Sequence, residues 1–590
     1  MQIKTKLTEE QLKNNQKKIN SIKNHFWVEK KSYPFIERQL IDKFKLSPIL
    51  AKILAMRGID RRTVLDFFNP KLKNLIPNPD TLDDMELATS KIVDCILKKK
   101  KFGLFGDYDV DGTTSTALLG GYFDEIGVEY DFYIPDRLND GYGPNIKAFR
   151  ELKKKDCDII ITLDCGTTSI SSINSIKKEN LEVIVVDHHQ EGEELPDAYA
   201  IINPNKRNDK SDLKNLSAVG VLFFLIISIN RELKKKNFFS ADVPNLVKFL
   251  DLVALGTVCD VVELDLINRT LVKQGLKVIN QSLNMGLNSL IDSSEINEVV
   301  KEYHLGYVLG PRINAGGRVG NSSLGTQLLL STKKSMANVI AKKLGDYNNL
   351  RKKIEKQVEL EAIKKVDLSR DGIICVSSDD WHPGVIGIVA SKLTEKFSRP
   401  SIVISESKKI CKASCRSVSN FDIGKLIFSA LEEGILISGG GHQMAGGFSI
   451  DKSKVDQLKG FVNDKFDPVK NEIKKFYDSE LIFSSISNEL YFLLDRLSPF
   501  GPGNPKPKFL IRGCLIKFVR LVGNNHLSCF VEDVYGNRIK GVSFNAYDSD
   551  MGKFLEKEMG KELDLVVSLK LNRWNGEENA EIQIEDALIA

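Results

Sequence analysis

Acidic and histidine side chains that can bind a metal ion stand directly after short apolar runs in this chain. These side chains are Asp107, Asp109, Asp111, Asp164, Asp187, His188, His189 and Asp260. The apolar runs before them cover residues 101–105, 157–163, 181–186 and 252–259. Each run has the length and composition of a buried strand. If the first three strands lie side by side in a parallel sheet, their carboxyl ends share one crevice, where open α/β sheets bind ligands.

Such a crevice would hold several carboxylates and an imidazole at close range. Like charges so close together do not all stay ionised unless a cation neutralises them. Imidazole and carboxylate ligands without thiolates favour Mn²⁺ or Mg²⁺. Two such ions, about 3.5–4 Å apart, can clamp a phosphodiester and activate a water for in-line attack. The sequence therefore predicts a two-metal site that hydrolyses phosphodiesters.

The alternation of Asp107, Asp109 and Asp111 predicts an extended loop whose alternate side chains reach different ions. Taken alone, the same segment is equally compatible with a calcium loop or a polar turn. An EF-hand loop that began at Asp107 would place a glutamate at its twelfth position, which here is Leu118. The histidine pair is more specific, because the chain has only 7 histidines and two of them are adjacent behind a carboxylate.

The elements that would position these residues belong to an α/β fold with a mainly parallel sheet. Residues 113–126 and 145–154 are helix-like and residues 128–134 are strand-like. Further along, a charged stretch without proline predicts one long helix, and short alternating runs near the end predict a β-barrel. We expect an N-terminal helical segment at 1–75, an α/β domain at 76–332, a linker helix at 333–368, a smaller α/β domain at 369–462 and the barrel at 463–590.

Size and composition limit the class of protein. The 590 residues exceed the roughly 250–300 that one core supports. No apolar run approaches the about 20 residues of a membrane-spanning helix, and no apolar signal segment is present, so we expect a cytoplasmic protein without membrane contact. The 9 cysteines form no CxxC pair, which disfavours a zinc ribbon. The absence of a GxxxxGK[ST] loop disfavours an ATP-driven motor. The net charge of +5 neither requires nor excludes a polyanionic substrate.

The ordered motifs of this chain resemble those of the DHH phosphoesterases. These motifs lie at 106–112 (GDYDVDG), 164–166 (DCG), 187–189 (DHH) and 256–260 (GTVCD). Further blocks resemble the RecJ branch of that family, and they lie at 134–143, 310–318, 439–447 and 499–505. The resemblance extends from about residue 45 to the end of the chain. It implies that the larger α/β domain is a DHH domain, the smaller one a DHHA1 domain and the barrel an OB-fold.

This resemblance implies a single-strand-specific DNA exonuclease of repair and recombination that starts at the 5′ end and releases mononucleotides with two Mn²⁺ or Mg²⁺ ions. The implied metal ligands are Asp107, Asp109, Asp111, Asp164, His188 and Asp260, with His189 beside the ions and Asp164 bridging them. In several relatives with smaller substrates a histidine stands four residues before the middle aspartate. That place is Phe105 here, as suits the RecJ branch, and Asp107 is expected to substitute as a ligand.

Polar groups expected to hold the nucleotide are Arg137, Arg312, Asn314, Arg318, Ser414, Arg416 and His442. Arginines 312 and 318 on a glycine-rich loop predict a phosphate fork, since guanidinium binds oxyanions bidentately; a structural salt bridge is the alternative. A second glycine-rich loop, 439–447, would offer bare backbone N–H groups to a phosphate. The resemblance implies that Ser414 and Arg416 hold the 5′ phosphate and that His442 lies near the cleaved nucleotide. Tyr142 is compatible with base stacking, although an ordinary turn is the better prediction there.

Two other functions stay open at this point. One is a DHH-family phosphodiesterase for very short oligonucleotides or small nucleotides, and the predicted strand-tracking barrel argues against it. The other is a non-catalytic nucleic-acid-binding scaffold, and the complete set of acids and histidines argues against that. We expect single-stranded DNA as the substrate and a monomer as the working form. A helicase and a single-strand-binding protein are partners that only the resemblance suggests.

Overall fold

The computed structural model describes residues 21–589 except 24, 138–139, 142, 241, 370–371, 407–408, 464, 467–472 and 575. Tyr142, for which an ordinary turn is predicted over base stacking, therefore lies outside the described residues. The chain forms two compact units, one made of Met1–Pro70 with Glu472–Ala590 and the other of Lys71–Asn471. Among the described helices, none has both the length and the apolar character needed to cross a bilayer.

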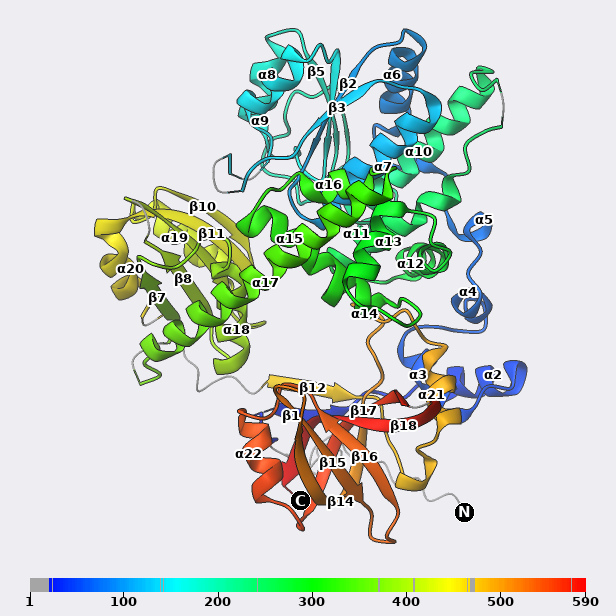
Figure 1. Cartoon of the computed structure of the whole chain (residues 1–590), viewed down its shortest axis with the longest axis vertical. Helices are drawn as coiled ribbons and strands as arrows, with labels where there is room; N and C mark the ends of the chain where they lie inside the picture. Colours follow the sequence, from blue (N-terminus) through cyan, green and yellow to red (C-terminus); the bar gives the residue numbers. More distant parts are fainter. Residues whose placement is uncertain are drawn as a thin grey trace, which may run out of the picture. The chain divides into compact units, whose positions relative to one another are not determined.

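A parallel sheet of five strands organises the first part of the larger unit (Figure 1). Its strands, in the order β3-β2-β4-β5-β6, are β2 (Phe102–Gly106), β3 (Tyr130–Tyr133), β4 (Ile159–Leu163), β5 (Glu182–Val186) and β6 (Ala200–Ile202). The prediction that the three apolar runs lie side by side is confirmed, because β2, β4 and β5 are neighbours. The strand order reverses between β2 and β4, and such a switch point is where open α/β sheets bind ligands.

Helices cover both faces of this sheet, as Figure 1 shows. Successive side chains of a strand point to opposite faces. Accordingly, Phe102 and Leu104 enter one core with α6 (Met85–Leu97), α7 (Val110–Ile126) and α10 (Ala218–Lys235). Phe105 enters the other core with α8 (Ile146–Lys154) and α9 (Ile170–Lys177). The predicted helices at 113–126 and 145–154 are thus confirmed.

Two segments have a different structure from the prediction. The apolar run 252–259 belongs to helix α11 (Leu250–Cys259), not to a strand. Short apolar runs do not separate a buried strand from a buried helix, and 8 residues of α11 are buried. The glycine-rich segment 310–318 is helix α15 (Gly310–Val319), not a loop. A Cβ on Gly316 would lie 2.7 Å from the carbonyl oxygen of Asn321, so glycine here permits close packing of a helix.

More helices complete the larger unit below the sheet in Figure 1. They are α5 (Leu72–Leu75), α12 (Leu266–Ile279), α13 (Met285–Ser293), α14 (Glu302–His304), the π-helical turn η3 (Leu305–Leu309), α16 (Leu324–Leu329) and α17 (Lys334–Lys365). Helix α17 confirms the predicted long helix and packs against α13, α15 and α18 (Ile386–Phe397).

A second sheet of five strands follows α17. Its strands, in the order β10-β11-β9-β8-β7, are β7 (Ile374–Ser378), β8 (Ser401–Ser405), β9 (Ile410–Arg416), β10 (Ser438–His442) and β11 (Ala445–Asp451). Helices α18, α19 (Ile423–Glu432) and α20 (Val455–Val462) accompany it. The predicted glycine-rich loop is wrong, because its residues form the antiparallel pair β10–β11 with Gly440 opposite Gly447. A Cβ on Gly441 would lie 2.6 Å from the carbonyl oxygen of Ala445, so the bare backbone serves strand pairing.

The smaller unit contains the predicted β-barrel. Strands β14 (Phe509–Val522), β15 (His526–Glu532), β16 (Arg538–Ser543), β18 (Glu577–Ile589) and β17 (Glu562–Trp574) pair in this order, and β14 also pairs with β17. The ring of five strands is therefore closed. The short strand β13 (Ser479–Glu480) pairs in parallel with β14, and α21 (Asn488–Asp495) and α22 (Asp550–Lys557) flank the barrel.

The N-terminal residues belong to the same unit as the barrel. They contain the expected helices α2 (Pro34–Phe44), α3 (Pro48–Met56) and α4 (Val64–Phe68), but they also contain a strand that the helical prediction missed. This strand, β1 (His25–Glu29), pairs in parallel with β12 (Ile473–Tyr477). Leu40 and Leu50 are buried in one core with the barrel residues Phe509 and Leu565. Residues so far apart in the sequence meet because the helices bury their apolar faces on the barrel.

Candidate metal centre and nucleotide site

The predicted metal-binding residues follow the carboxyl ends of β2, β4 and β5, except for Asp260, which follows helix α11. The backbone N–H of Asp107 donates to the carbonyl oxygen of Leu163 at 3.1 Å, and that of Asp164 donates to Val186 at 2.9 Å. These bonds extend the strand pairing by one residue beyond each strand. The carboxylates are therefore held at the switch point of the sheet, where the sequence places them.

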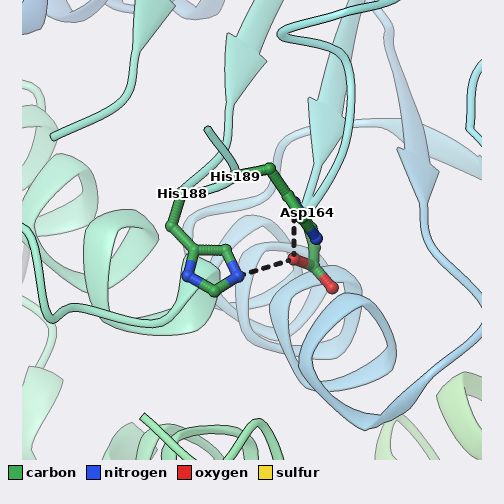
Figure 2. Close-up of side chains that lie close together, drawn as sticks. All are labelled: Asp164, His188 and His189. Atoms are coloured by element: carbon green, nitrogen blue, oxygen red, sulfur yellow. Dashed lines mark ion pairs between the residues drawn. The ribbon is translucent and has the colours of Figure 1, made fainter. Parts of the chain in front are cut away.

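Ligand atoms from all the implied metal ligands and from His189 form three groups, and the atoms of each group lie within 4.8 Å of one another. The groups are Asp107 with Asp109 and Asp164, Asp111 with His188 and Asp260, and Asp164 with His188 and His189. Asp164 and His188 each belong to two groups, so the three groups form one continuous site. Figure 2 shows both imidazoles next to the Asp164 carboxylate. The predicted residues are thus brought together in the folded chain.

His188 lies at the centre of this arrangement. Its Nε2 is 3.4 Å from Oδ1 of Asp164 and 3.4 Å from Oδ2 of Asp260, and it is 3.9 Å from Oδ2 of Asp111. Within the described part of the chain, four buried atoms here have no hydrogen-bond partner: Oδ1 of Asp107, Oδ1 of Asp164, Nε2 of His188 and Oδ2 of Asp260. Buried polar atoms without partners are costly. Four that converge on one place, all oxygen or imidazole nitrogen, fit divalent cations such as Mn²⁺ and Mg²⁺.

Asp109 and Asp111 lie at the start of helix α7, so the predicted extended loop is wrong for this segment. Asp109 is the N-cap of α7, and its side chain accepts from the backbone N–H of Gly112. Asp111 is buried in the first turn, where its carboxylate accepts from the N–H groups of Ala218 and Val219 at 2.6 and 3.0 Å. The carboxylate of Asp111 is therefore fixed by the N-terminus of α10. This contact keeps it at the site although its backbone is helical.

Burial and mutual repulsion disfavour ionised carboxylates in this site when no cation is bound. Burial and the charge of Asp109 raise the pKa of Asp107 and of Asp164 well above the usual range of a carboxyl. The same two causes raise the pKa of Asp111 to about 7. Burial together with the charges of Asp111 and Asp109 raises the pKa of Asp260 to about 9. In the metal-free protein these carboxyls therefore retain protons, and bound cations would displace them.

The two histidines have opposite protonation preferences. Burial and the charge of His189 lower the pKa of His188 to about 4, so its imidazole is neutral, the form that binds metals. Burial also disfavours a charged His189, but the hydrogen bond and the charge of Asp187 outweigh burial and raise the pKa of His189 to about 9. Nδ1 of His189 lies 2.7 Å from Oδ1 of Asp187. His189 is therefore positively charged at neutral pH.

Asp187, which is not among the implied metal ligands, and two asparagines that the sequence analysis missed hold this histidine pair. Asp187 accepts from the backbone N–H groups of both histidines, at 2.8 and 3.1 Å. The side-chain amide of Asn203 donates to the carbonyl oxygen of His189 at 2.8 Å, and that of Asn205 donates to the carbonyl oxygen of His188. The signal for the asparagines is weak in the sequence, because they follow the short strand β6 rather than a long apolar run.

Arginines from both α/β parts of the larger unit lie near one another. Burial lowers the pKa of Arg318 to about 10, and the charges of Arg137, Arg351 and Arg416 contribute to that shift. Arg137 lies over the ring of Tyr108 at 5.2 Å, and Arg318 donates to the carbonyl oxygen of Gly384 at 3.1 Å. Cations that crowd together while buried favour an anionic ligand between them. The guanidinium of Arg416 donates to Oγ of Ser414 at 3.3 Å, so the two predicted residues are in contact.

The remaining predicted nucleotide contacts are more dispersed. Arg312 donates to the carbonyl oxygen of Val308, one turn back along the continuous helix. Burial lowers the pKa of Arg312, and the charge of Glu295 opposes that shift. Asn314 is half-buried on α15. His442 is exposed at the end of β10, in register with Ala445, which pairs with Arg416. His442 and Arg416 therefore lie in one row of the sheet, two strands apart.

Comparison with known proteins agrees with this arrangement. Residues 101–257 match the model of the N-terminal domain of the DHH family, residues 371–467 match the DHHA1 domain, and residues 477–586 match the RecJ OB domain. The chain is 33% identical, over 92% of its length and 96% of the relative, to the single-stranded-DNA-specific exonuclease RecJ of Salmonella typhimurium.

This chain belongs to the RecJ family. The RecJ of Bacillus subtilis is 32% identical over 94% of this chain and 69% of the relative. Among solved RecJ structures, that of Thermus thermophilus in complex with Mn²⁺ has a TM-score of 0.80 at 26% identity and covers 95% of this chain and 79% of that chain. The Mg²⁺ complex of the same RecJ has a TM-score of 0.75 at 25% identity, with 95% and 78% covered. The α/β architecture and the closed barrel are thus those of RecJ.

Proposed function

We propose that this chain is a single-strand-specific 5′-to-3′ DNA exonuclease that hydrolyses phosphodiesters with two divalent ions, Mn²⁺ or Mg²⁺, and releases 5′-mononucleotides. The observation that carries this proposal is the convergence of four buried, unpartnered ligand atoms at the switch point of the sheet, within the described residues. The names of the RecJ relatives supply the substrate, single-stranded DNA. Repair and recombination are the processes in which such an activity would serve.

In this proposal Asp107, Asp109, Asp111, Asp164, His188 and Asp260 hold the ions. Asp164 would bridge them, because it belongs to two of the three ligand groups and, unlike the imidazole of His188, a carboxylate can offer one oxygen to each ion. Bound divalent ions polarise a phosphodiester and lower the pKa of a coordinated water. His189, charged through its bond to Asp187, adds a positive charge beside the phosphate undergoing attack. Asp187 and the α10 N-terminus fix the positions of His189 and Asp111, which is the preorganisation that catalysis requires.

The arginines that lie near one another account for digestion from the 5′ end. Arg137, Arg318 and Arg416 with Ser414 would bind the terminal 5′ phosphate between the two α/β parts, and Arg312, Asn314 and His442 would contact neighbouring nucleotides. Support comes from the buried position of Arg318 among three other guanidinium groups. A terminal phosphate fixed in this way sets the distance from the strand end to the ions, so each cut removes the same short product.

Digestion of end-labelled DNA tests this function. Single-stranded and duplex DNA are incubated with the protein and Mn²⁺ or Mg²⁺, and products are resolved by length. Mononucleotides released from the 5′ end of the single strand are expected, with the duplex spared. Cleavage confined to dinucleotides would instead indicate a short-oligonucleotide phosphodiesterase, and strand binding without cleavage would indicate a scaffold.

Asp164→Asn tests the site assignment. Loss of one charge from the shared ligand is expected to abolish cleavage and reduce Mn²⁺ uptake measured by calorimetry. Asp251→Asn is the matched control, because Asp251 is also a buried carboxyl, with a pKa that burial raises to about 7, but it belongs to none of the ligand groups in the described residues. Normal cleavage by Asp164→Asn would refute the assignment. The domain limits, the monomeric state, the cytoplasmic location and the helicase and single-strand-binding partners stay predictions.

A further inference from the structure

Two tyrosines in the segment that leads into α15 expose most of their surface. Tyr303 is 60% exposed and Tyr307 is 75% exposed. Their rings are stacked, with centroids 5.1 Å apart and planes inclined by 23°. Large aromatic rings are usually at least half buried in folded proteins. A stacked pair that leaves this much ring surface in solvent is therefore available to a further flat ligand.

A π-helical turn sets the direction of these rings. Helix α14, the turn η3 and helix α15 run without a break from Glu302 to Val319, and η3 is the π-helical part. The tyrosines are four residues apart, so they share one face of this continuous helix. Single π-helical turns inside α-helices are rare and are frequent at functional sites. Tyr307 lies within that turn, and Tyr303 lies just before it.

This turn packs against the helix that carries a predicted metal ligand. The thiol of Cys259 donates to the carbonyl oxygen of Leu305 at 3.3 Å, and a Cβ on Gly306 would lie 3.5 Å from Cγ1 of Val258. The next residue of that helix end is Asp260. The segment that carries the tyrosines is thus in direct contact with the helix end that precedes Asp260.

Val261, directly after Asp260, also points to a ligand at this place. Its φ is +62°, a conformation that is an outlier for a β-branched residue. The side chain is 65% exposed, so burial within the protein does not compensate for the backbone strain. Strained residues of this kind gather where a protein contacts a ligand.

Positive charge accompanies the rings. Arg312 is half-buried, and its guanidinium donates to the carbonyl oxygen of Val308, the residue after Tyr307, at 2.8 Å. Burial and the charge of Arg312 lower the pKa of Lys352, so a second cation lies near Arg312. Aromatic rings beside cations form the surface on which single-stranded nucleic acids bind, because bases stack on the rings while phosphates contact the cations.

We propose that Tyr303 and Tyr307 form a stacking platform for unpaired bases of the strand next to the cleaved phosphodiester. This proposal rests on the nuclease function proposed above and adds a source of strand selectivity to it. A base in a duplex is already stacked and paired, so only an unpaired base gains from the platform. The tyrosines thereby favour single strands through binding energy as well as through exclusion of the duplex.

A cycle of protein and DNA changes tests the platform. The variant Tyr303→Leu/Tyr307→Leu removes both rings, Tyr303→Phe/Tyr307→Phe keeps them, and Phe35→Leu removes a ring that is 76% exposed at a distant place in the sequence. Mononucleotide release with Mn²⁺ is measured on a normal single strand and on a strand whose internal nucleotides are abasic. Mn²⁺ uptake checks that the metal site is intact.

The leucine variant is expected to lose about tenfold in kcat/KM on the normal strand, as base stacking predicts. The phenylalanine variant and Phe35→Leu should match the wild type. On the abasic strand the leucine variant and the wild type should be equal. An equal loss on both strands, or no loss on either, would overturn the platform. A wild-type protein that cuts no single strand would overturn the nuclease function itself.

Discussion

At the scale of single residues, this protein buries several carboxyl groups away from water and close to one another. Asp164 and Asp111 are buried next to other carboxylates, and each has a raised pKa. Asp187 is buried as well, but hydrogen bonds from His189 and Thr167 keep its pKa below the usual range. The raised pKa values belong to carboxyls that lack a neutralising cation, and the lowered one belongs to a carboxyl that already accepts hydrogen bonds. Burial and hydrogen bonding together decide which role an aspartate has.

Asp187→Asn tests the orienting role of this carboxylate. The amide keeps the shape of the side chain but removes the charge that holds His189 protonated. Partners in the outer shell of metal sites typically contribute about 10–100-fold to activity. We therefore expect kcat to fall by roughly that factor, with the pKa of His189, followed by NMR, moving down from about 9. An unchanged His189 titration would contradict the assignment.

Metal uptake is expected to release protons. With pKa values of about 7 at Asp111 and about 9 at Asp260, the metal-free site holds protons at neutral pH. Mn²⁺ affinity should therefore rise with pH between about 6 and 9. Calorimetry in buffers of different ionisation enthalpy measures the released protons. Binding whose heat is independent of the buffer would exclude this coupling.

The same pKa values predict the stability of the metal-free protein. An unfolded carboxyl loses its proton near pH 4, whereas these carboxyls keep theirs up to pH 7 or 9 in the folded state. The folded state binds more protons over this range, so the free energy of unfolding falls as pH rises. Added Mn²⁺ should reverse that loss. Thermal denaturation with and without the ion gives the comparison.

At the scale of elements, small residues let helices approach the metal ligands. Helix α11 crosses α7 at Gly256, where a Cβ would lie 2.4 Å from Oγ1 of Thr114 and 2.9 Å from Oδ1 of Asp111. Gly112 allows the first turn of α7 to reach Asp107, since a Cβ there would lie 2.5 Å from the carbonyl oxygen of Asp107. The ligands of the site thus depend on close packing of elements that the motif glycines permit.

Gly256→Ala is expected to destabilise the protein by about 1–3 kcal/mol, because the added methyl group overpacks a buried contact. Displacement of Asp111 should also weaken Mn²⁺ uptake. Gly345→Ala is the matched control in helix α17, since nothing lies within 4 Å of its Cβ position. That change should stabilise the protein by roughly 0.5–1 kcal/mol through helix propensity. Denaturant unfolding compares the two, and equal effects would refute the packing argument.

At the scale of the whole molecule, chain segments far apart in the sequence complete each unit. Strand β1 pairs with β12, and Nε1 of Trp27 in β1 donates to the carboxylate of Asp586 at 2.8 Å. Ser21 and His25 also face this buried acid, which lies in the last strand of the barrel. The N-terminal residues are therefore part of the barrel unit and not a separate segment.

Trp27→Phe tests this link. The ring remains, but the buried carboxylate of Asp586 loses a donor, so the barrel unit should lose about 1–3 kcal/mol of stability. Mn²⁺ uptake should stay unchanged, because the metal site belongs to the other compact unit. Denaturation monitored together with calorimetry measures both. A parallel loss of metal binding would show that the two units do not act independently.

The sequence alone predicted which acidic and histidine side chains the fold brings together, and which fold carries them. Three of the four apolar runs that precede carboxylates are parallel strands with a shared crevice, and they could be predicted because apolar runs and ligand types are local properties of the chain. Only the tertiary structure decided that Asp260 follows the end of a helix and Arg318 lies on one, that Asn203 and Asn205 support the histidines, and that β1 completes the barrel unit. Each of these depends on contacts between distant segments, and local patterns of hydrophobicity carry no information about such contacts.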